Sequence, residues 1–126
     1  MRFPFDPTAP VIAVDVEIVI GGASFLLEMI LDTGATQTIV DSHVLSRYKS
    51  VPIATSVSQT ITALGGSPAA REHELDRPTA LANTHPMMRV LAMDTQMLGY
   101  DGLLGKDFLQ NKVLTLDFRQ GTIELI

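Results

Sequence analysis

The stretch Leu31-Asp32-Thr33-Gly34-Ala35-Thr36 is the most informative part of this 126-residue sequence. It places one carboxylate at the end of an apolar run and follows it with a small hydroxyl residue and a glycine. A carboxylate in dry surroundings needs hydrogen-bond donors close by. Thr33 offers a hydroxyl, and Gly34 lets backbone N–H groups approach without a side chain in the way. Taken alone, the Asp-Thr-Gly tripeptide also fits an ordinary turn after a strand.

The residues before this stretch predict an antiparallel hairpin. From Val11 to Ile20 every even position is apolar and β-branched, while acidic residues stand between them. That period of two is typical of a strand with one buried and one solvated face. Gly21-Gly22 can supply the positive φ angles of a tight turn, and Ser24 to Leu31 returns as a second strand. The hairpin therefore delivers the chain to Asp32.

The rest of the chain alternates short strands with turn signals. Asp41 or Ser42 can cap a short helix that runs through His43 to Tyr48 and ends before Pro52. The other expected elements are a hairpin of Val57–Ala63 and Ala69–Leu75, strands at Thr79–Ala82 and Met88–Ala92, a helix at Lys106–Asn111, and a closing hairpin of Val113–Phe118 and Thr122–Ile126.

Composition narrows the possible functions. The chain is 46% hydrophobic with a net charge of −5, so we expect one globular domain over residues 1–126, in which residues 1–10 form an extended N-terminal segment. No basic stripe suggests a nucleic-acid or anionic-membrane partner. The absence of cysteine excludes disulfides and thiolate chemistry. Neither a signal peptide nor a membrane span is visible, so the expected location is cytoplasmic.

Three separated segments resemble the retropepsin-like, single-lobed aspartic peptidases. The first is Asp32-Thr33-Gly34-Ala35 at the end of a strand. The second is the hairpin of Thr62 to Glu72 with two glycines at its tip, which is similar to the glycine-rich flap of that family. The third runs from Leu103 to Phe118 and is similar to the family's motif of two apolar residues and a glycine, its helix and the next strand. The resemblance implies an all-β acid-protease barrel with one or two short helices in a single lobe.

The resemblance also implies roles for individual residues. The catalytic motif would be Asp32, Thr33 and Gly34. Substrate would lie against Ala35 and Thr36 on one side and, on the other, under a flap of Ala63, Leu64, Gly65, Gly66 and Ser67. Leu103, Leu104 and Gly105 would support the active site. No cofactor or metal is implied.

The sequence holds only one Asp-Thr-Gly motif. Because aspartic peptidase chemistry needs two carboxylates facing one water, the resemblance implies a homodimer that pairs two copies of Asp32 and cleaves an extended peptide. At about 3 Å and an effective dielectric constant near 20, two carboxylates repel by about 5 kcal/mol, which keeps one of them protonated. The ionised carboxylate would activate water while the protonated one polarises the scissile carbonyl.

The sequence departs from the retroviral pattern in ways that keep other readings open. Retroviral members have an acid after the alanine and an arginine after the late glycine, where this chain has Thr36 and Lys106. The chain also continues from Arg119 to Ile126, beyond the resemblance. One alternative is a catalytically silent dimerisation or peptide-binding module, and another is a monomer with an unpaired Asp32. The glycine hairpin could equally be a plain surface hairpin. The three histidines show no metal-ligand spacing and are expected in surface or capping roles.

Overall fold

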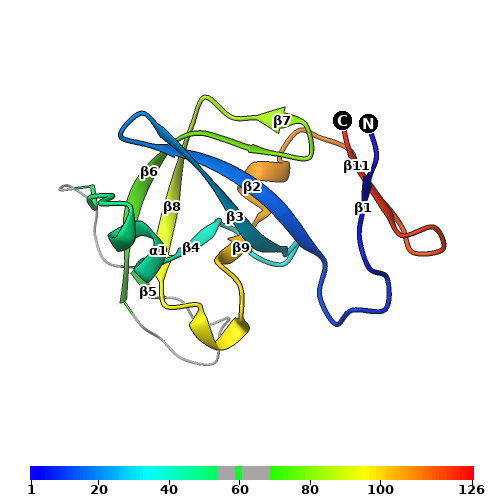
Figure 1. Cartoon of the computed structure of the whole chain (residues 1–126), viewed down its shortest axis with the longest axis horizontal. Helices are drawn as coiled ribbons and strands as arrows, with labels where there is room; N and C mark the ends of the chain where they lie inside the picture. The colour runs from blue at the N-terminus through cyan, green and yellow to red at the C-terminus, as the bar shows by residue number, and fades with distance from the viewer. Residues whose placement is uncertain (54–58, 61–68) are drawn as a thin grey trace.

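The computed structural model describes residues 1–53, 59–60 and 69–126. Six strands in this part of the chain form a closed mixed barrel (Figure 1). In spatial order they are β2 (Ala13–Ile20), β3 (Ala23–Leu31), β9 (Gly102–Leu104), β4 (Ile39–Asp41), β8 (Met87–Met93) and β6 (Ala69–Ala80), and a pairing between β6 and β2 closes the ring. The β3–β9 and β4–β8 pairs are parallel, and the others are antiparallel. Two short strands, β5 (Gln59–Thr60) and β7 (Asn83–Thr84), pair with β6.

Short helices and a second sheet complete the described chain. The helices are α1 (Ser42–Arg47), the 3₁₀ turn η1 (Gln96–Leu98) and α2 (Lys106–Leu109). The second sheet has the order β1 (Phe3–Pro4), β11 (Thr122–Leu125) and β10 (Leu114–Asp117). It lies to one side of the barrel and contains both chain ends (Figure 1). None of the described helices has the length and apolar character needed to cross a membrane.

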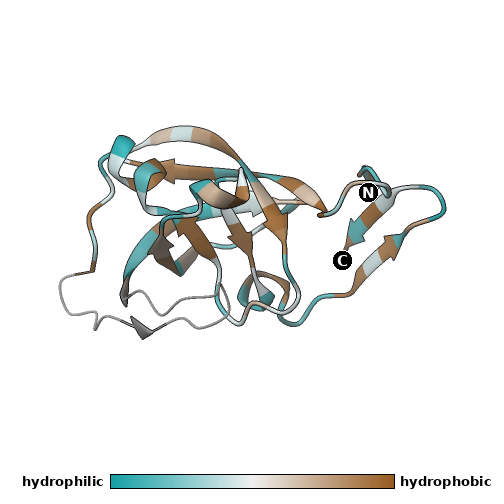
Figure 2. Cartoon of the chain, turned by 90° about the horizontal axis from the view of Figure 1, so that it is seen from below, coloured by the Kyte–Doolittle hydropathy of each residue, from teal (hydrophilic) through white to brown (hydrophobic). Residues whose placement is uncertain are grey.

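The predicted first hairpin is confirmed, with strands at Ala13–Ile20 and Ala23–Leu31. Val14, Val16 and Ile18 are at most 6% exposed, whereas the acidic residues between them face solvent. Gly21 and Gly22 have φ angles of 59° and 81°, which explains why glycine occupies both turn positions. The alternation of buried and exposed residues gives the hairpin one buried and one solvated face. Figure 2 shows hydrophobic and hydrophilic residues mixed along the strands of the chain.

The barrel interior is a continuous apolar core. Its largest fully buried side chains include Phe108, Ile18 and Met29. The predicted helix after β4 is also confirmed, because the Asp41 side chain accepts the N–H of His43 and so caps α1. Phe108 lies in α2, so the segment beside the predicted support motif is anchored in the core. Burial of this kind makes α2 a fixed part of the barrel despite its length of four residues.

Some predicted element boundaries were wrong. No separate strand covers Thr79–Ala82, because β6 continues to Ala80 and then turns through Leu81 and Ala82, with φ angles of 52° and 62°. The helix expected at Lys106–Asn111 ends at Leu109, and Asn111 has a φ of 64°. Of the strand expected at Val57–Ala63, only residues 59–60 lie in the described chain, where they form β5.

Candidate active site

Asp32 is placed by a parallel pair of strands rather than by a long loop. Leu31, at the end of β3, is paired with Leu104 of β9, and Ile30 is paired with Leu103. The next N–H along the chain, that of Asp32, donates to the Leu104 carbonyl at 3.0 Å. Leu103 and Leu104 are 5% and 1% exposed. The buried strand ladder therefore fixes the backbone of Asp32 directly.

The Asp32 carboxylate is oriented by the residues that follow it. The N–H of Gly34 donates to Asp32 Oδ1 at 2.9 Å, and the N–H of Ala35 donates to the Asp32 carbonyl at 3.2 Å. A Cβ atom on Gly34 would lie 3.2 Å from Asp32 Oδ1, which is tight for a carbon beside a carboxylate oxygen. Asp32 is half-buried, whereas Thr33 and Gly34 are exposed. The motif thus holds one carboxylate oxygen at the molecular surface by a backbone hydrogen bond.

Gly105 and Lys106 brace the loop that begins at Asp32. The N–H of Lys106 donates to the Ala35 carbonyl at 2.8 Å. A Cβ atom on Gly105 would lie 2.8 Å from the same carbonyl oxygen and 3.0 Å from the carbonyl carbon of Gln37. Such a contact is too short for any side chain, so glycine is required for the close approach of the two backbones. The structure therefore brings Gly105 against the loop that carries Asp32.

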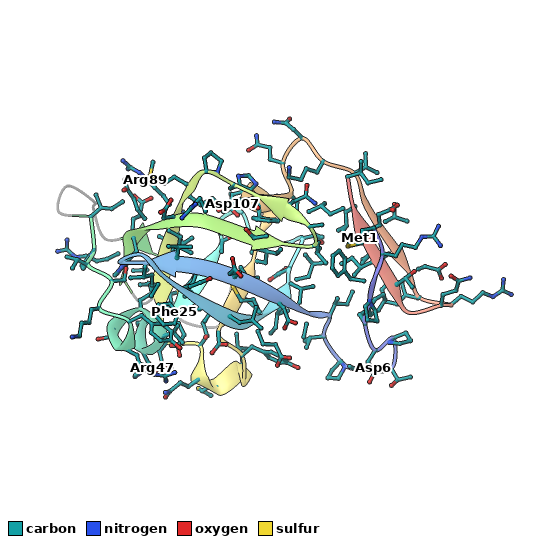
Figure 3. All side chains as sticks on the ribbon, turned by 45° about the horizontal axis from the view of Figure 1, so that its top comes forward. Met1, Asp6, Phe25, Arg47, Arg89 and Asp107 are labelled. Atoms are coloured by element: carbon teal, nitrogen blue, oxygen red, sulfur yellow. The ribbon has the colours of Figure 1, made fainter. Side chains whose placement is uncertain are left out.

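A second carboxylate, not singled out in the sequence, secures the far end of that loop. Asp107 accepts the N–H of Thr38 at 2.9 Å on Oδ2 and the Thr38 hydroxyl at 2.6 Å on Oδ1 (Asp107 is labelled in Figure 3). Thr38 is 2% exposed, and its hydroxyl oxygen in turn accepts the N–H of Gly105 at 3.0 Å. Oδ1 of Asp107 also accepts the N–H of Phe108. This network ties the loop to α2.

Gln37 connects the same loop to two other strands. Its side-chain amide donates to Glu72 Oε2 on β6 and to the Arg89 carbonyl on β8, both at 3.3 Å. Gln37 is half-buried. The loop is therefore held at its start by β9, at Ala35 and Thr38 by α2, and at Gln37 by the β6–β8 pair.

Thr36 and Lys106, the two departures from the retroviral pattern, lie together. Both line a recess of about 450 Å³, with Asp107, Leu109 and Gln110. The predicted flap residues Ala63, Leu64, Gly65, Gly66 and Ser67 lie outside the described residues. A recess of about 580 Å³ beside Gly21 and Lys49 contains none of the predicted site residues. The described part of the predicted site is thus the Asp32 loop with its support and this smaller recess.

His43 differs from the expectation that no histidine has metal-ligand spacing. His43 lies beside two acidic residues, since its Nδ1 is 3.2 Å from Asp41 Oδ1 and 3.8 Å from Asp94 Oδ1. These three residues have ligand atoms within 4.8 Å of one another, a spacing that could hold a metal ion. Asp41 Oδ1 also accepts the backbone N–H groups of His43 and Thr95, so its role in capping α1 explains the position of the Asp41 side chain.

His73 is buried rather than superficial. It is 6% exposed, and its Nδ1 lies 2.9 Å from the Ser50 hydroxyl. Burial lowers the pKa of His73 below its ordinary value of 6.5 because the charged imidazolium loses solvation. At the surface, hydrogen bonds from the Thr8 side chain and backbone lower the pKa of Asp6. Among the described residues, neither group forms a hydrogen bond with the Asp32 loop.

Comparison with known proteins agrees with this geometry. Residues 15–108 match the family model described as "Aspartyl protease". The chain is similar to the crystal structure of a retropepsin-like aspartic protease from Rickettsia conorii, with a TM-score of 0.71 at 11% sequence identity over 99% of this chain and 90% of that one. No match was found among curated proteins. At that identity the structural match establishes the fold, and the family match covers most of the chain. The chain therefore belongs to the aspartyl protease family and has the retropepsin-like fold.

Proposed function

We propose that this protein is an aspartic endopeptidase that works as a homodimer through a pair of Asp32 carboxylates. The observation that carries the proposal is the surface position of the Asp32 carboxylate, oriented by the Gly34 N–H at the end of a buried strand. Membership of the aspartyl protease family supports a peptidase activity. Because one chain supplies one Asp-Thr-Gly motif, a second copy must supply the other carboxylate.

The proposed reaction is hydrolysis without a covalent intermediate. One ionised Asp32 takes a proton from a water molecule, and the water oxygen attacks the scissile carbonyl carbon. The protonated Asp32 of the other copy donates its proton to the carbonyl oxygen, which gives a gem-diol. Breakdown of the gem-diol returns a proton to the amide nitrogen, breaks the C–N bond and releases a carboxylic acid and an amine. Each copy's loop needs only to hold its carboxylate in place.

The proposed substrate is an extended peptide. It would lie along Ala35 and Thr36, which follow Asp32 directly and are half-buried and exposed respectively. An extended chain offers alternate side chains to alternate sides, so neighbouring recesses select side chains. The recess lined by Thr36, Lys106 and Leu109 is a candidate for one of them. The predicted flap residues 63–67 would cover the other side of the peptide.

A matched pair of variants tests the activity. Asp32→Asn keeps an oxygen that can accept the Gly34 N–H but cannot serve as the ionised carboxylate, so cleavage of a peptide library between pH 4 and 7 should be lost. Asp94→Asn makes the same change at the other Asp-Thr pair of the chain and should cleave as the wild type does. A statine-type inhibitor should block the wild type. Retained cleavage by the Asp32→Asn variant would contradict the assignment.

The second candidate function is a catalytically silent dimerisation or peptide-binding module of the same fold. This second candidate is favoured by Thr36 and Lys106 at the recess. Retroviral members have an acid and an arginine at these positions, which form an ion pair, whereas a threonine and a lysine cannot form one. This candidate predicts no cleavage by the wild type at any pH tested, together with binding of a peptide that the Asp32→Asn variant retains.

A further inference from the structure

Asp41, His43 and Asp94 meet where two parallel strands end. Asp41 is the last residue of β4, and it is paired with Met93, the last residue of β8. Because parallel strands run in the same direction, the residues that follow them leave the sheet at the same end. Asp94 follows Met93 directly, and His43 lies in the first turn of α1, which begins after Asp41. Figure 1 shows α1 beside β4 and β8.

The Asp41 carboxylate is almost completely buried, yet one of its oxygens has no partner. The side chain is 8% exposed. All of its hydrogen bonds involve Oδ1, which accepts the N–H groups of His43 and Thr95 at 3.4 and 3.3 Å. Within residues 1–53, 59–60 and 69–126, Oδ2 forms no hydrogen bond. A buried carboxylate oxygen ordinarily meets a donor or a cation. Capping of α1 therefore accounts for Oδ1 and leaves Oδ2 without a role.

No basic side chain neutralises this cluster in the part of the chain that the structure describes. The ion pairs of Asp41 and Asp94 there involve His43 alone, through its Nδ1. Two carboxylates at such close range repel each other unless a cation lies between them. A divalent cation would cancel both charges, whereas the single charge of an imidazolium cancels one. The charge balance of the cluster therefore favours a metal ion.

The distances suit one small ion. The ligand atoms of the three residues all lie within 4.8 Å of one another. Zn²⁺ binds imidazole nitrogen and carboxylate oxygen at about 2.0–2.2 Å, so two ligand atoms of one ion lie about 3.0–3.6 Å apart. His43 Nδ1 and Asp41 Oδ1 already have this spacing, at 3.2 Å. Asp94, whose side chain is 61% exposed, can close the remaining gap by a rotation of its side chain. The imidazole favours Zn²⁺ over Mg²⁺ and Ca²⁺, which prefer oxygen ligands.

We propose that Asp41, His43 and Asp94 bind Zn²⁺ through His43 Nδ1 and one oxygen of each carboxylate, with water as the fourth ligand of a tetrahedral site. The ion joins the start of α1 to the turn after β8 and so stabilises the folded chain. None of the three residues belongs to the Asp32 loop or lines the recess at Thr36. The inference is therefore independent of the proposed peptidase activity.

The first experiment titrates the untagged, chelator-treated full chain with Zn²⁺ alone in a calorimeter. The wild type should bind one Zn²⁺ per chain. Asp41→Asn keeps a good cap for α1, and Asp94→Asn keeps the oxygen that accepts the N–H of Gln96. These two variants and His43→Gln should each raise the dissociation constant at least about 100-fold, because even a residue that only orients a metal ligand contributes about 10- to 100-fold.

His85→Gln is the matched control. His85 lies outside the cluster, and a glutamine amide can still donate to the Phe108 carbonyl that His85 Nε2 contacts at 3.0 Å. This variant should bind Zn²⁺ as the wild type does. Equal binding by the wild type and all three cluster variants, or no binding by the wild type, would overturn the proposal.

The second experiment identifies the ligand atom. In the ¹⁵N-labelled chain, the Nδ1 resonance of His43 should shift when Zn²⁺ is added, whereas the imidazole resonances of His73 and His85 should not. The melting temperature should rise by about 5–10 °C at a Zn²⁺ concentration 100 times the dissociation constant, and this rise should be absent in His43→Gln. Shifts at His73 or His85 without one at His43 would overturn the site.

The zinc site and the peptidase activity fail separately. Asp32→Asn should bind Zn²⁺ as the wild type does, because Asp32 is not part of the cluster. Asp94→Asn should lose Zn²⁺ binding and still cleave peptides. Zinc binding by a wild type that cleaves nothing supports the site and refutes the peptidase. Zinc binding that is lost in Asp32→Asn as well as in Asp94→Asn would overturn the assigned ligands.

Discussion

Asp32 begins the loop that ends at Thr38, and Asp107 of α2 holds the end of that loop, yet the two carboxylates differ in their hydrogen bonds. Both oxygens of Asp107 accept hydrogen bonds, from the backbone and hydroxyl of Thr38 and from the N–H of Phe108. Among the described residues, Asp32 accepts one backbone N–H, on Oδ1. A saturated carboxylate contributes to the fold, whereas an unsaturated one at the surface is free to meet a water or a substrate. The difference separates a structural acid, Asp107, from the proposed catalytic acid, Asp32, at the two ends of one loop.

The largest expected effect comes from replacing Asp32, the proposed catalytic acid. Asp32→Asn should lower kcat/KM for a cleaved peptide about 10³-fold or more, because a neutral amide cannot take the proton from water. The melting temperature should change little, since Asn Oδ1 can still accept the Gly34 N–H. Steady-state kinetics measures the loss of kcat/KM, and a thermal melt of the same sample measures the melting temperature. A large drop in melting temperature with intact activity would reverse the roles given to the two acids.

The next effect comes from removing the structural acid. Asp107→Ala leaves the N–H of Thr38 buried without its acceptor, so the free energy of unfolding should fall by about 3 kcal/mol. Urea denaturation followed by circular dichroism measures this change. Asp107→Asn, which keeps one acceptor oxygen, is the control and should lose less. Unfolding within about 0.5 kcal/mol of wild type for Asp107→Ala would show that the network does not stabilise the fold.

Gly105 and Gly34 allow a second comparison between the support of the loop and the Asp32 motif. Gly105→Ala brings a Cβ atom to 2.8 Å from the backbone oxygen of Ala35, so it should lower the free energy of unfolding by about 2 kcal/mol. In the described part of the chain, the Cβ atom of Gly34→Ala meets the Asp32 carboxylate alone, at 3.2 Å, so this variant should disturb activity more than stability. Melts and kinetics on both variants give the two readouts. If both variants lost stability and activity in the same proportion, the distinction between a structural Gly105 and a site Gly34 would be contradicted.

The smallest effect concerns a titratable group away from the loop. Burial lowers the pKa of His73, so the unfolded chain binds more protons than the folded chain once the pH falls below the ordinary value of 6.5. Stability should therefore be fully present above that pH and decrease as the pH falls toward the lowered pKa. The slope of melting temperature against pH should be shallower in His73→Asn, which can still bond Ser50, than in wild type. Parallel slopes would contradict a role for His73.

Local signals in the sequence predicted the parts of the fold that depend on neighbours in the chain. Alternation from Val11 to Ile20, the Gly21-Gly22 turn and the Asp41 cap each involve residues close in sequence, and the structure confirms them. The boundary of β6 was wrong because Pro78 suggested a break. The strand instead accommodates Pro78 at an irregularity, where Arg77 has a φ of 47° and the pairing with β2 shifts register.

The support of the site could be predicted only in part. The resemblance singled out Gly105, and the structure places it against Ala35. Thr38 and Asp107 are 69 residues apart, and no pattern in the sequence around either residue predicts a hydrogen bond between them. The pairing of the buried Thr38 with the half-buried Asp107 exists only once the fold brings the Asp32 loop and α2 together. The same holds for Asp94, which approaches His43 only in the folded chain.

The amide of Gln37 has a mechanical consequence for the chain. It joins the loop that starts at Asp32 to Glu72 of β6 and to the carbonyl of Arg89 on β8. β6 is the longest described strand and is the one that follows directly after residues 61–68. A displacement of β6 along its length would move the Gln37 amide and with it the loop, so the motions of β6 and the loop are coupled. In the proposed peptidase, strain introduced at β6 would then be transmitted to the loop that holds Asp32.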